Sequence, residues 1–260
     1  FDELGYLYFP ALVDAAGCDA LLGEILAKTA PHVVSGEPTP RLAGAPFFET
    51  DTAWDALYPE IQSLERFHAF FHTPQMLALQ RRIVDAEPFV YPMKMARIST
   101  PRKVGYETPP HQDAHSHQAG PTMAGIWVAL HEVPAELGRL KLLARSHTRG
   151  VRPVFQADGV GGIQCEIHPD ETEWHVSDYG RGDVVIFHSC TVHKAEPNLA
   201  RDAVRISVDT RFCDHGAPVF RTNIEPHHGW RIPRLDWEYV YRDWSEDGLK
   251  YYWRDYPAIT

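Results

Sequence analysis

The sequence predicts a mainly β protein with flanking helices, built as a sandwich or barrel. From about Glu87, short apolar or alternating runs recur between Gly, Pro and Asp residues, which is typical of short strands joined by turns. Upstream of Glu87, the apolar residues follow helical spacing. Downstream of His227, the chain is rich in aromatic residues. The length of 260 residues is sufficient for one large domain with a sizeable core.

The N-terminal part combines one short strand with a helix. Residues 5–9 form an apolar, aromatic run that ends at Pro10, and we expect a strand there. Asp14 has the side chain of a helix N-cap, and a helix is expected from this residue to about Ala30. Its apolar face would be formed by leucine and isoleucine residues at helical spacing.

Residues 31–52 contain several prolines and glycines, which is typical of a loop. Two further helices are then expected. One runs from about Pro59 to Phe71, and the next begins at Thr73-Pro74, a cap followed by proline at the first helical position.

The expected strands of the β part share an apolar or alternating pattern of five to ten residues. They are residues 89–98, 125–133, 139–143, 183–187, 191–195 and 204–212. Stretches 159–162 and 171–179 are expected to be loops at one mouth of the barrel. In the aromatic tail, Trp237, Tyr241 and Trp244 have helical spacing, which favours a packing stripe against the β core over a substrate lid.

The charge balance restricts the classes of partner. The chain has 25 basic and 35 acidic residues, a net charge of −10. Nucleic acid and anionic membranes attract positively charged proteins, so neither is expected as a partner. A small-molecule substrate is the partner that we expect, and the sequence leaves the oligomeric state open.

The cysteines indicate the compartment. Cys18, Cys165, Cys190 and Cys213 are far apart and form no Cys-x-x-Cys pair, so a disulfide framework or a thiolate zinc site is not expected. The longest apolar runs are too short to span a bilayer, and the first residues show no signal peptide. We therefore predict a cytoplasmic location.

Two side chains that can bind a metal lie one residue apart in the segment 109–115. They are His111 and Asp113, and on an extended strand such residues point to the same face. An imidazole and a carboxylate on one side of an ion, with open positions opposite, form the beginning of a non-haem iron site. A chain with 15 histidines also produces His-x-Asp by chance, so a surface loop is the alternative at this point.

The segment 182–198 supplies a third candidate ligand. A Gly-Asp turn leads into a buried strand, and a second short strand carries His193. Twelve positions later, Arg205 begins an alternating strand on which Arg205, Ser207, Asp209 and Arg211 share one face. A guanidinium forms a planar fork that matches a carboxylate, although an exposed arginine on an edge strand is the simpler alternative.

In this order, His111, Asp113, His193 and Arg205 resemble the residues of the non-haem iron, 2-oxoglutarate-dependent dioxygenases, and within them the phytanoyl-CoA dioxygenase family. The resemblance extends over most of the chain. It includes the opening strand and helix, the segment 111–115, the stretch from Gly138 to His147 and the segment 182–198.

The resemblance implies a double-stranded β-helix, or jelly roll, with helices packed outside it. It also implies that His111, Asp113 and His193 are the catalytic metal ligands and hold Fe(II), and that Arg205 pairs with the far carboxylate of 2-oxoglutarate. O2 would be the oxidant. Further cosubstrate contacts are implied at these positions: Trp127, Gln112, Met95 and Lys94. The family often has Ser or Thr two places after the distal histidine, where this chain has Ala195; Thr191 or a tyrosine is the expected substitute.

The implied activity is oxidation of an unactivated C–H bond of a small molecule, most simply hydroxylation, with release of succinate and CO2. The halogenating relatives have Gly or Ala at the position of Asp113, so the carboxylate favours oxygenation. Two other classes stay open, a redox-neutral metal-dependent isomerase or hydrolase of the cupin type and a non-catalytic jelly-roll binding module. We expect one domain over 1–260, with a mainly helical part at 1–86, a jelly-roll core at 87–213 and an aromatic extension at 214–260.

Overall fold

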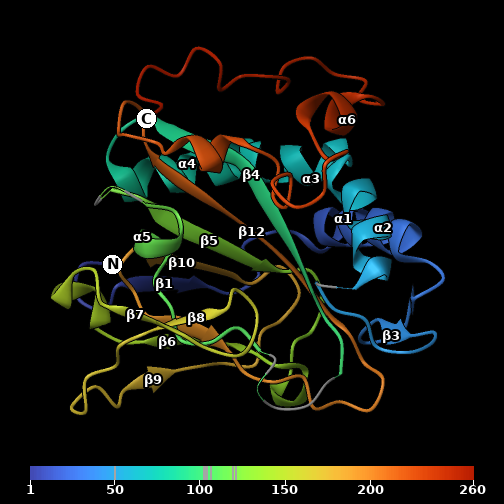
Figure 1. Ribbon diagram of the computed structural model, residues 1–260, viewed down its shortest axis with the longest axis horizontal. Coiled ribbons are helices and arrows are strands. Elements are labelled where there is room, and N and C mark those ends of the chain that lie inside the picture. The colour runs from blue at the N-terminus through green and yellow to red at the C-terminus, as the bar shows by residue number, and fades with distance from the viewer. Residues whose placement is uncertain (50, 102–104, 106, 119, 121) are drawn as a thin grey trace.

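The computed structural model describes residues 1–49, 51–101, 105, 107–118, 120 and 122–260. Figure 1 shows strands on one side of the molecule and most of the helices above and beside them. The helices are α1 (Ala15–Thr29), α2 (Thr52–Gln62), α3 (Glu65–Ala69), α4 (Pro74–Val84), α5 (Asp113–Ser116) and α6 (Trp237–Tyr241), with short 3-10 turns η1 (Phe70–His72), η2 (Ala135–Leu137), η3 (Ser146–Arg149) and η4 (Arg221–Ile224).

The strands form one larger sheet, one smaller sheet and two two-stranded sheets. They are β1 (Tyr6–Phe9), β2 (Val33–Val34), β3 (Arg41–Leu42), β4 (Pro88–Ser99), β5 (Ala124–Ala129), β6 (Leu140–Leu143), β7 (Val154–Gln156), β8 (Ile163–Cys165), β9 (Trp174–His175), β10 (Val184–His188), β11 (His193–Ala195) and β12 (Arg205–Asp214). Each expected strand of the β part therefore exists, with its ends moved by a few residues.

The larger sheet has the strand order β1-β10-β5-β12-β4, and the smaller one has the order β11-β6-β9. The pairings are antiparallel throughout, and neighbours in the sheet are distant in the sequence. The β7–β8 hairpin lies beside the smaller sheet (Figure 1). This arrangement is the expected double-stranded β-helix.

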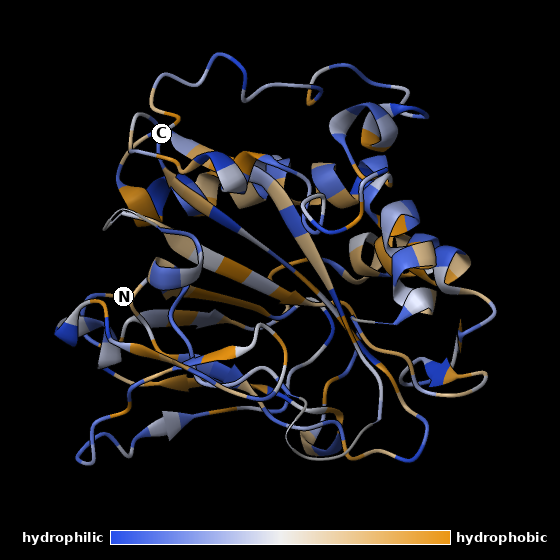
Figure 2. Ribbon diagram, viewed as in Figure 1, coloured by the Kyte–Doolittle hydropathy of each residue, from blue (hydrophilic) through white to orange (hydrophobic). Residues whose placement is uncertain are grey.

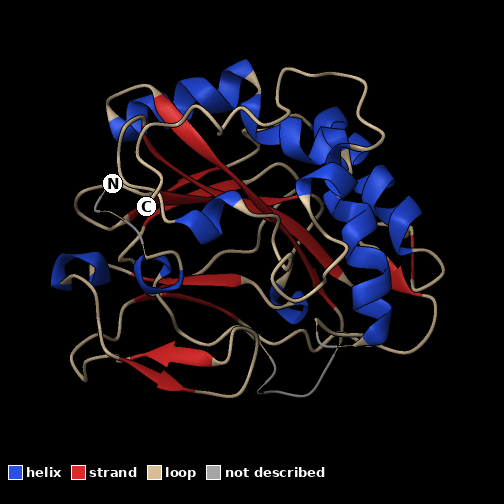
Figure 3. Cartoon of the chain, turned by 45° about the horizontal axis from the view of Figure 1, so that its top comes forward, coloured by secondary structure: helices blue, strands red, loops and turns tan. Residues whose placement is uncertain are grey.

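Alternation along the strands gives the larger sheet two different faces. On β12, Ile206, Val208 and Phe212 belong to a large core cluster with residues of α1, α2 and the C-terminal tail. Arg205, Asp209 and Arg211 point the other way and line a cavity. Figure 2 shows the apolar segments along the central strands, and Figure 3 shows the helices gathered against one side of the larger sheet. The two faces arise because successive side chains of a strand point in opposite directions.

In the helical part, the two predicted N-caps are observed, but one predicted helix start is wrong. Asp14 accepts a hydrogen bond from the Gly17 amide, and Thr73 caps the Met76 amide, as the cap patterns predict. The expected helix from Pro59 is wrong, because α2 begins at Thr52 and contains Pro59 in its interior. The chain then leaves the helix at Ser63 and Leu64 before α3 begins.

The aromatic tail forms part of the core. Trp237, Tyr241 and Trp244 are buried in the same cluster as the helices and the outer face of the larger sheet. The Trp237 indole donates to the Ile224 carbonyl, and the Trp244 indole donates to the Ser63 carbonyl. Trp230 differs from them: it is 78% exposed and lies at the edge of the cavity. The expected packing stripe is therefore observed, with one exposed tryptophan outside it.

Two further observations concern the compartment. The four cysteines are free and buried. None of the helices in the described part of the chain combines the length and apolar character needed to cross a membrane.

Candidate metal centre

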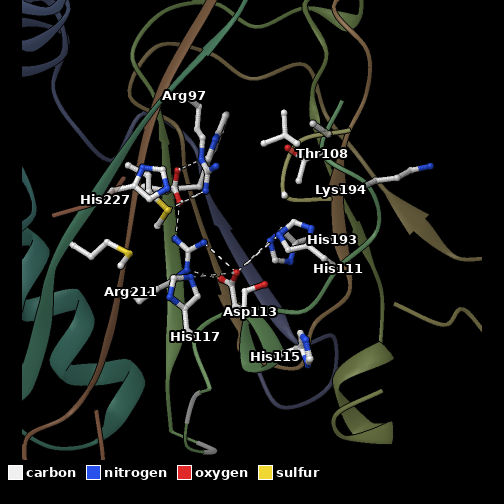
Figure 4. A pocket seen from close by; sticks show the side chains of 18 of the residues that line it. Arg97, Thr108, His111, Asp113, His115, His117, His193, Lys194, Arg211 and His227 are labelled. Carbon is white, nitrogen blue, oxygen red and sulfur yellow. Dashed lines mark hydrogen bonds and ion pairs between the residues drawn. The ribbon is translucent and has the colours of Figure 1, made fainter. Parts of the chain in front are cut away.

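His111, Asp113 and His193 lie together between the two sheets. One ligand atom from each of the three residues lies within 4.8 Å of the others, and Asp113 Oδ1 is 3.9 Å from the Nε2 atoms of both histidines. Figure 4 shows the two imidazoles side by side on one flank of the Asp113 carboxylate. Two nitrogen donors and one carboxylate oxygen therefore face a common point.

The hydrogen bonds of the two imidazoles fix which nitrogen is free. His111 Nδ1 lies 2.8 Å from the Pro109 carbonyl, and His193 Nδ1 lies 3.0 Å from the Thr191 carbonyl. Since a carbonyl only accepts, each Nδ1 carries the proton and each Nε2 keeps its lone pair for a metal. Burial lowers the pKa of His193, and burial together with the neighbouring His193 lowers the pKa of His111 to about 3. Both rings are neutral, as metal ligands must be.

Asp113 is 1% exposed and is ionised because of an arginine. Burial alone would raise the pKa of this carboxyl, but the positive charge of Arg211 holds the pKa well below its ordinary value. Arg211 Nε is 2.5 Å from Asp113 Oδ2, and Arg211 Nη2 donates to Asp113 Oδ1 at 3.1 Å. The donor set, two neutral imidazoles and one carboxylate with an open cavity beside them, fits Fe(II).

The local structure corrects one expectation. His111 and Asp113 do not share one strand, because His111 forms an isolated bridge with His193 and Asp113 is the first residue of α5. Gln112 between them is extended, so the two side chains still point the same way. The backbone amides and carbonyls of His111 and His193 are hydrogen-bonded to each other, which brings the two ligands together.

A cavity of about 590 Å³ opens beside the three ligands. Its walls come from β4, β5, β11, β12, the stretch 160–163 before and within β8, and the segment that follows β12. The polar lining residues include Arg97, Thr108, His117, Arg205, Asp209, Arg211, Asn223 and His227. The three candidate ligands therefore border a larger space that can hold small molecules.

Three of the expected cosubstrate residues line this cavity. They are Arg205, Trp127 and Met95, all of them buried. Arg205 donates to the Gly138 carbonyl through Nη1, and the Trp127 indole donates to Ser207 Oγ at 3.0 Å. Both contacts orient side chains of the inner face.

Three other expected residues are not among the residues that line the cavity. Lys94 alternates with Met93 and Met95 and lies on the opposite face of β4, where its ammonium donates to the Tyr91 carbonyl. The Gln112 amide is hydrogen-bonded to Gly150, Cys190 and Arg152. Thr191 Oγ1 donates to the Gly5 carbonyl at 2.7 Å. Their roles in cosubstrate binding are therefore disfavoured, because each polar group is used elsewhere.

Thr108 supplies a hydroxyl-bearing side chain near Ala195, the position where the family often has Ser or Thr. Thr108 lines the cavity, and its carbonyl accepts a hydrogen bond from the Ala195 amide at 3.2 Å. Figure 4 shows the Thr108 side chain above His193. No sequence pattern indicates Thr108, because only the pairing across the barrel mouth brings it opposite Ala195.

The structure adds a chain of buried charges that the sequence did not predict. Asp209 lies between two arginines: Arg97 Nε donates to its Oδ1 at 2.9 Å, and Arg211 Nη1 donates to its Oδ2 at 2.5 Å. Arg211 continues the chain to Asp113. The alternation of β12 indicates that Asp209 and Arg211 share a face with Arg205. The pairing of β12 with β4 brings Arg97 beside them, and only the fold could reveal that.

Four histidines outside the candidate ligand set contact neighbouring groups. His117 Nδ1 is hydrogen-bonded to Asn223 at 2.8 Å, and its Nε2 lies 3.9 Å from Asp113 Oδ1. His227 lines the cavity and contacts the Tyr58 hydroxyl at 2.6 Å, and His228 is buried. His188 accepts from the Cys190 amide, a structural role, and burial raises the pKa of the Cys190 thiol.

Comparisons with known proteins identify the family of this chain. The family model described as Phytanoyl-CoA dioxygenase (PhyH) matches residues 1–206. Phytanoyl-CoA dioxygenase domain-containing protein 1 of Mus musculus is 30% identical over 140 residues, which are 51% of this chain and 47% of that protein. The chain thus spans about half the length of this relative. The 1-deoxypentalenic acid 11-beta-hydroxylase of Streptomyces arenae is 26% identical over 81% of this chain and 78% of its own length.

Solved structures share the fold. The non-heme alpha ketoglutarate dependent epimerase SnoN from nogalamycin biosynthesis has a TM-score of 0.59 and 21% identity, covering 84% of this chain and 81% of its own. EvdO2 from Micromonospora carbonacea var. aurantiaca has a TM-score of 0.57 and 21% identity, covering 82% and 87%. The double-stranded β-helix, the metal-binding geometry and the family match together show that this chain belongs to the phytanoyl-CoA dioxygenase family.

Proposed function

We propose that this protein is an Fe(II)- and 2-oxoglutarate-dependent oxygenase that hydroxylates an unactivated C–H bond of a small molecule. The observation that supports this most directly is the donor set of His111, Asp113 and His193, with ligand atoms within 4.8 Å of one another beside a large cavity. Two neutral imidazoles and one carboxylate occupy one side of a metal and leave its other positions open.

The bound metal and cosubstrate would supply the oxidative chemistry, in which O2 and 2-oxoglutarate are consumed and succinate and CO2 are released. The residues of this chain would bind and orient the reactants. His111, Asp113 and His193 would hold the metal. Arg205, buried on the inner face of β12, would supply a fixed positive charge for the far carboxylate of 2-oxoglutarate. Trp127 and Met95 would form the apolar wall of that pocket and exclude water.

Asp113 also bears on the reaction outcome. Its carboxylate occupies the position that halogenating relatives leave small, which supports oxygenation over halogenation. The similarity to a 1-deoxypentalenic acid 11-beta-hydroxylase supports a role in specialised metabolism, with hydroxylation as the reaction. The volume of this cavity, about 590 Å³, lies within the range of pockets that bind drug-sized ligands.

Part of the cavity wall is built by residues beyond the segment that the family model matches. Asn223, His227 and Trp230 line the cavity and follow residue 206, where that match ends. We therefore infer that the segment after β12 selects the substrate, while the shared part of the fold holds metal and cosubstrate. The same distribution supports one catalytic domain over residues 1–260, because the cavity needs side chains from β4 through Trp230.

The test is anaerobic addition of Fe(II) and 2-oxoglutarate, followed by visible spectroscopy. Chelation of the metal by the keto acid should give a weak charge-transfer band that neither reagent gives alone. A redox-neutral metalloenzyme of the cupin type would bind metal without this band, and a non-catalytic binding module would bind neither. Metal binding without the band would contradict the proposed function. Screening candidate compounds for stimulated succinate formation would then identify the substrate.

The location is a separate proposal. Four free, buried cysteines are compatible with a reducing compartment, and we propose the cytoplasm. Fractionation of the source cells, with the protein detected by antibody, would test it.

A further inference from the structure

Arg211 holds the metal-ligand carboxylate from the side opposite to the imidazoles. Its side chain is 3% exposed, and the guanidinium presents two nitrogens to the carboxylate: Nε lies 2.5 Å from Oδ2, and Nη2 donates to Oδ1 at 3.1 Å. In Figure 4, Arg211 lies on one side of Asp113 and the two imidazoles lie on the other. The carboxylate is therefore fixed in rotation as well as in position.

The two oxygens of Asp113 are consequently unequal. Oδ1 is the oxygen that lies 3.9 Å from Nε2 of both His111 and His193, so it faces the site where a metal would bind. Oδ2 is in contact with Arg211 Nε at 2.5 Å. A carboxylate can bind a metal through one oxygen or both, and here Oδ2 is in ion-pair contact with Arg211 Nε, while the hydrogen bond from Arg211 Nη2 goes to Oδ1.

Arg211 is itself held in place. Its Nη1 donates to Asp209 Oδ2 at 2.5 Å and to the Thr210 carbonyl at 3.1 Å. Gly125, the partner of Arg211 on β5, leaves room for these groups, since a Cβ there would lie 3.1 Å from Asp113 Oδ2 and 2.5 Å from the Phe187 ring. The guanidinium therefore cannot swing away without breaking several contacts.

We propose that Arg211 is a positioning residue that makes Asp113 bind the metal through Oδ1 alone, which keeps two adjacent metal positions free for the keto acid of 2-oxoglutarate. This inference rests on the proposed function. Without Arg211, the freed Oδ2 can move onto the metal and occupy one of the positions that chelation requires. Arg211 acts through Asp113 and needs no contact with the substrate.

The test separates metal binding from cosubstrate binding. Arg211→Gln and Arg211→Lys are compared with wild type by Co(II) titration, by 2-oxoglutarate titration of the metal-loaded protein and by the anaerobic Fe(II)/2-oxoglutarate band. We expect Arg211→Gln to keep metal binding while its 2-oxoglutarate affinity falls roughly 10- to 100-fold and the band shifts or weakens. Arg211→Lys keeps the charge but loses the fork, and it should rescue the affinity only in part.

Arg152→Lys is a matched control. Arg152 forms a buried two-pronged pair with Glu171, at 2.5 and 2.6 Å, and is not among the residues that line the cavity. This variant should resemble wild type in both titrations. If Arg211→Gln fails to fold, judged by circular dichroism, Asp209→Asn loosens Arg211 from the other side and should lower 2-oxoglutarate affinity in the same direction.

Two results would overturn the inference. One is unchanged 2-oxoglutarate affinity and an unchanged band in folded Arg211 variants. The other is loss of Co(II) binding in folded Arg211→Lys, because Arg211 would then be needed for the metal itself. Failure of the proposed function looks different: wild type itself would bind Co(II) and show no 2-oxoglutarate-dependent band.

Discussion

Each of the three candidate ligand side chains is constrained by a contact to a neighbouring group. The two Nδ1 atoms donate to backbone carbonyls, and Asp113 is held by Arg211. Contacts of this kind fix the orientation of ligands and are costly to remove. Single substitutions of these residues therefore test the candidate ligand set directly.

Removal of a ligand should abolish turnover. His111→Ala or Asp113→Ala leaves a metal with two protein donors, so we expect iron binding to weaken and iron-dependent conversion of 2-oxoglutarate to succinate to be lost. Co(II) titration and a succinate assay measure the two effects. His115→Ala is the neighbouring control, since His115 is exposed and lies outside the triad, and it should keep metal binding. Turnover that survives in either ligand variant would remove that residue from the ligand set.

Substitution of Arg205 should lower the affinity for 2-oxoglutarate and leave the affinity for the metal largely unchanged. Arg205→Ala removes a charged hydrogen-bond donor, which corresponds to roughly a 10- to 100-fold loss of 2-oxoglutarate affinity. Isothermal titration of the metal-loaded protein gives the affinity, and Co(II) titration gives the metal affinity. If the variant loses the metal instead, Arg205 has a structural role, for example through its contact with the Gly138 carbonyl.

At the scale of elements, the segment after β12 has two tasks. Its helix α6 covers the helical layer with buried aromatics, while His227 and Trp230 border the cavity. The same stretch thus contributes to both stability and substrate selection. Deletion of residues 230–260 should unfold the protein, because the deletion removes Trp237, Tyr241 and Trp244 from the core; a folded, soluble product would indicate a lid instead.

Single tryptophan variants separate the two tasks. Trp237→Ala should lower the free energy of unfolding by about 3–5 kcal/mol, since it removes a buried indole and its hydrogen bond to Ile224. Trp230→Ala should leave this free energy nearly unchanged, because Trp230 is 78% exposed, and should raise the KM for the substrate. Urea denaturation measures the first effect and steady-state kinetics the second. Equal destabilisation by both variants would contradict the assignment of Trp237 to stability and of Trp230 to substrate binding.

At the scale of the whole molecule, neutral imidazoles are buried in both layers. Burial lowers the pKa of His68 and His72 in the helical layer to about 3 and that of His131 to about 4. In the unfolded chain these groups take up protons near pH 6.5. Between that pH and about 4, the unfolded state therefore binds more protons than the folded state, and acid favours unfolding.

The free energy of unfolding should therefore fall as pH falls from about 6.5 toward 4. The slope can reach about 1.4 kcal/mol per pH unit for each imidazole that stays neutral in the folded state. Urea denaturation in EDTA at several pH values measures it without interference from metal binding. His68→Asn should reduce the slope, and a stability that does not change across this range would contradict the prediction.

Much of the fold followed from local patterns. Asp14 and Thr73 mark two helix starts, and the alternation of β12 assigns Arg205, Asp209 and Arg211 to one face. The start of α2 was missed because its proline lies in the helix interior. The resemblance implies a cosubstrate contact for Lys94 as well as for Met95, but neighbouring residues of a strand point to opposite faces, and only Met95 lines the cavity.

The sequence by itself determined a mainly β fold and the His-x-Asp pair, which follow from spacing and alternation within short segments. The double-stranded β-helix, the full candidate ligand set and the family were implied by the resemblance of these segments, in their order, to a known family. Only the tertiary structure decided which charges meet, because Arg97, Asp113, Asp209 and Arg211 come from three separate segments. Strand β12 lies between β5 and β4, so the guanidinium of Arg211 can contact Asp113 on one side and Asp209 on the other. Pairing between distant strands determines such neighbours, and no single stretch of sequence encodes it.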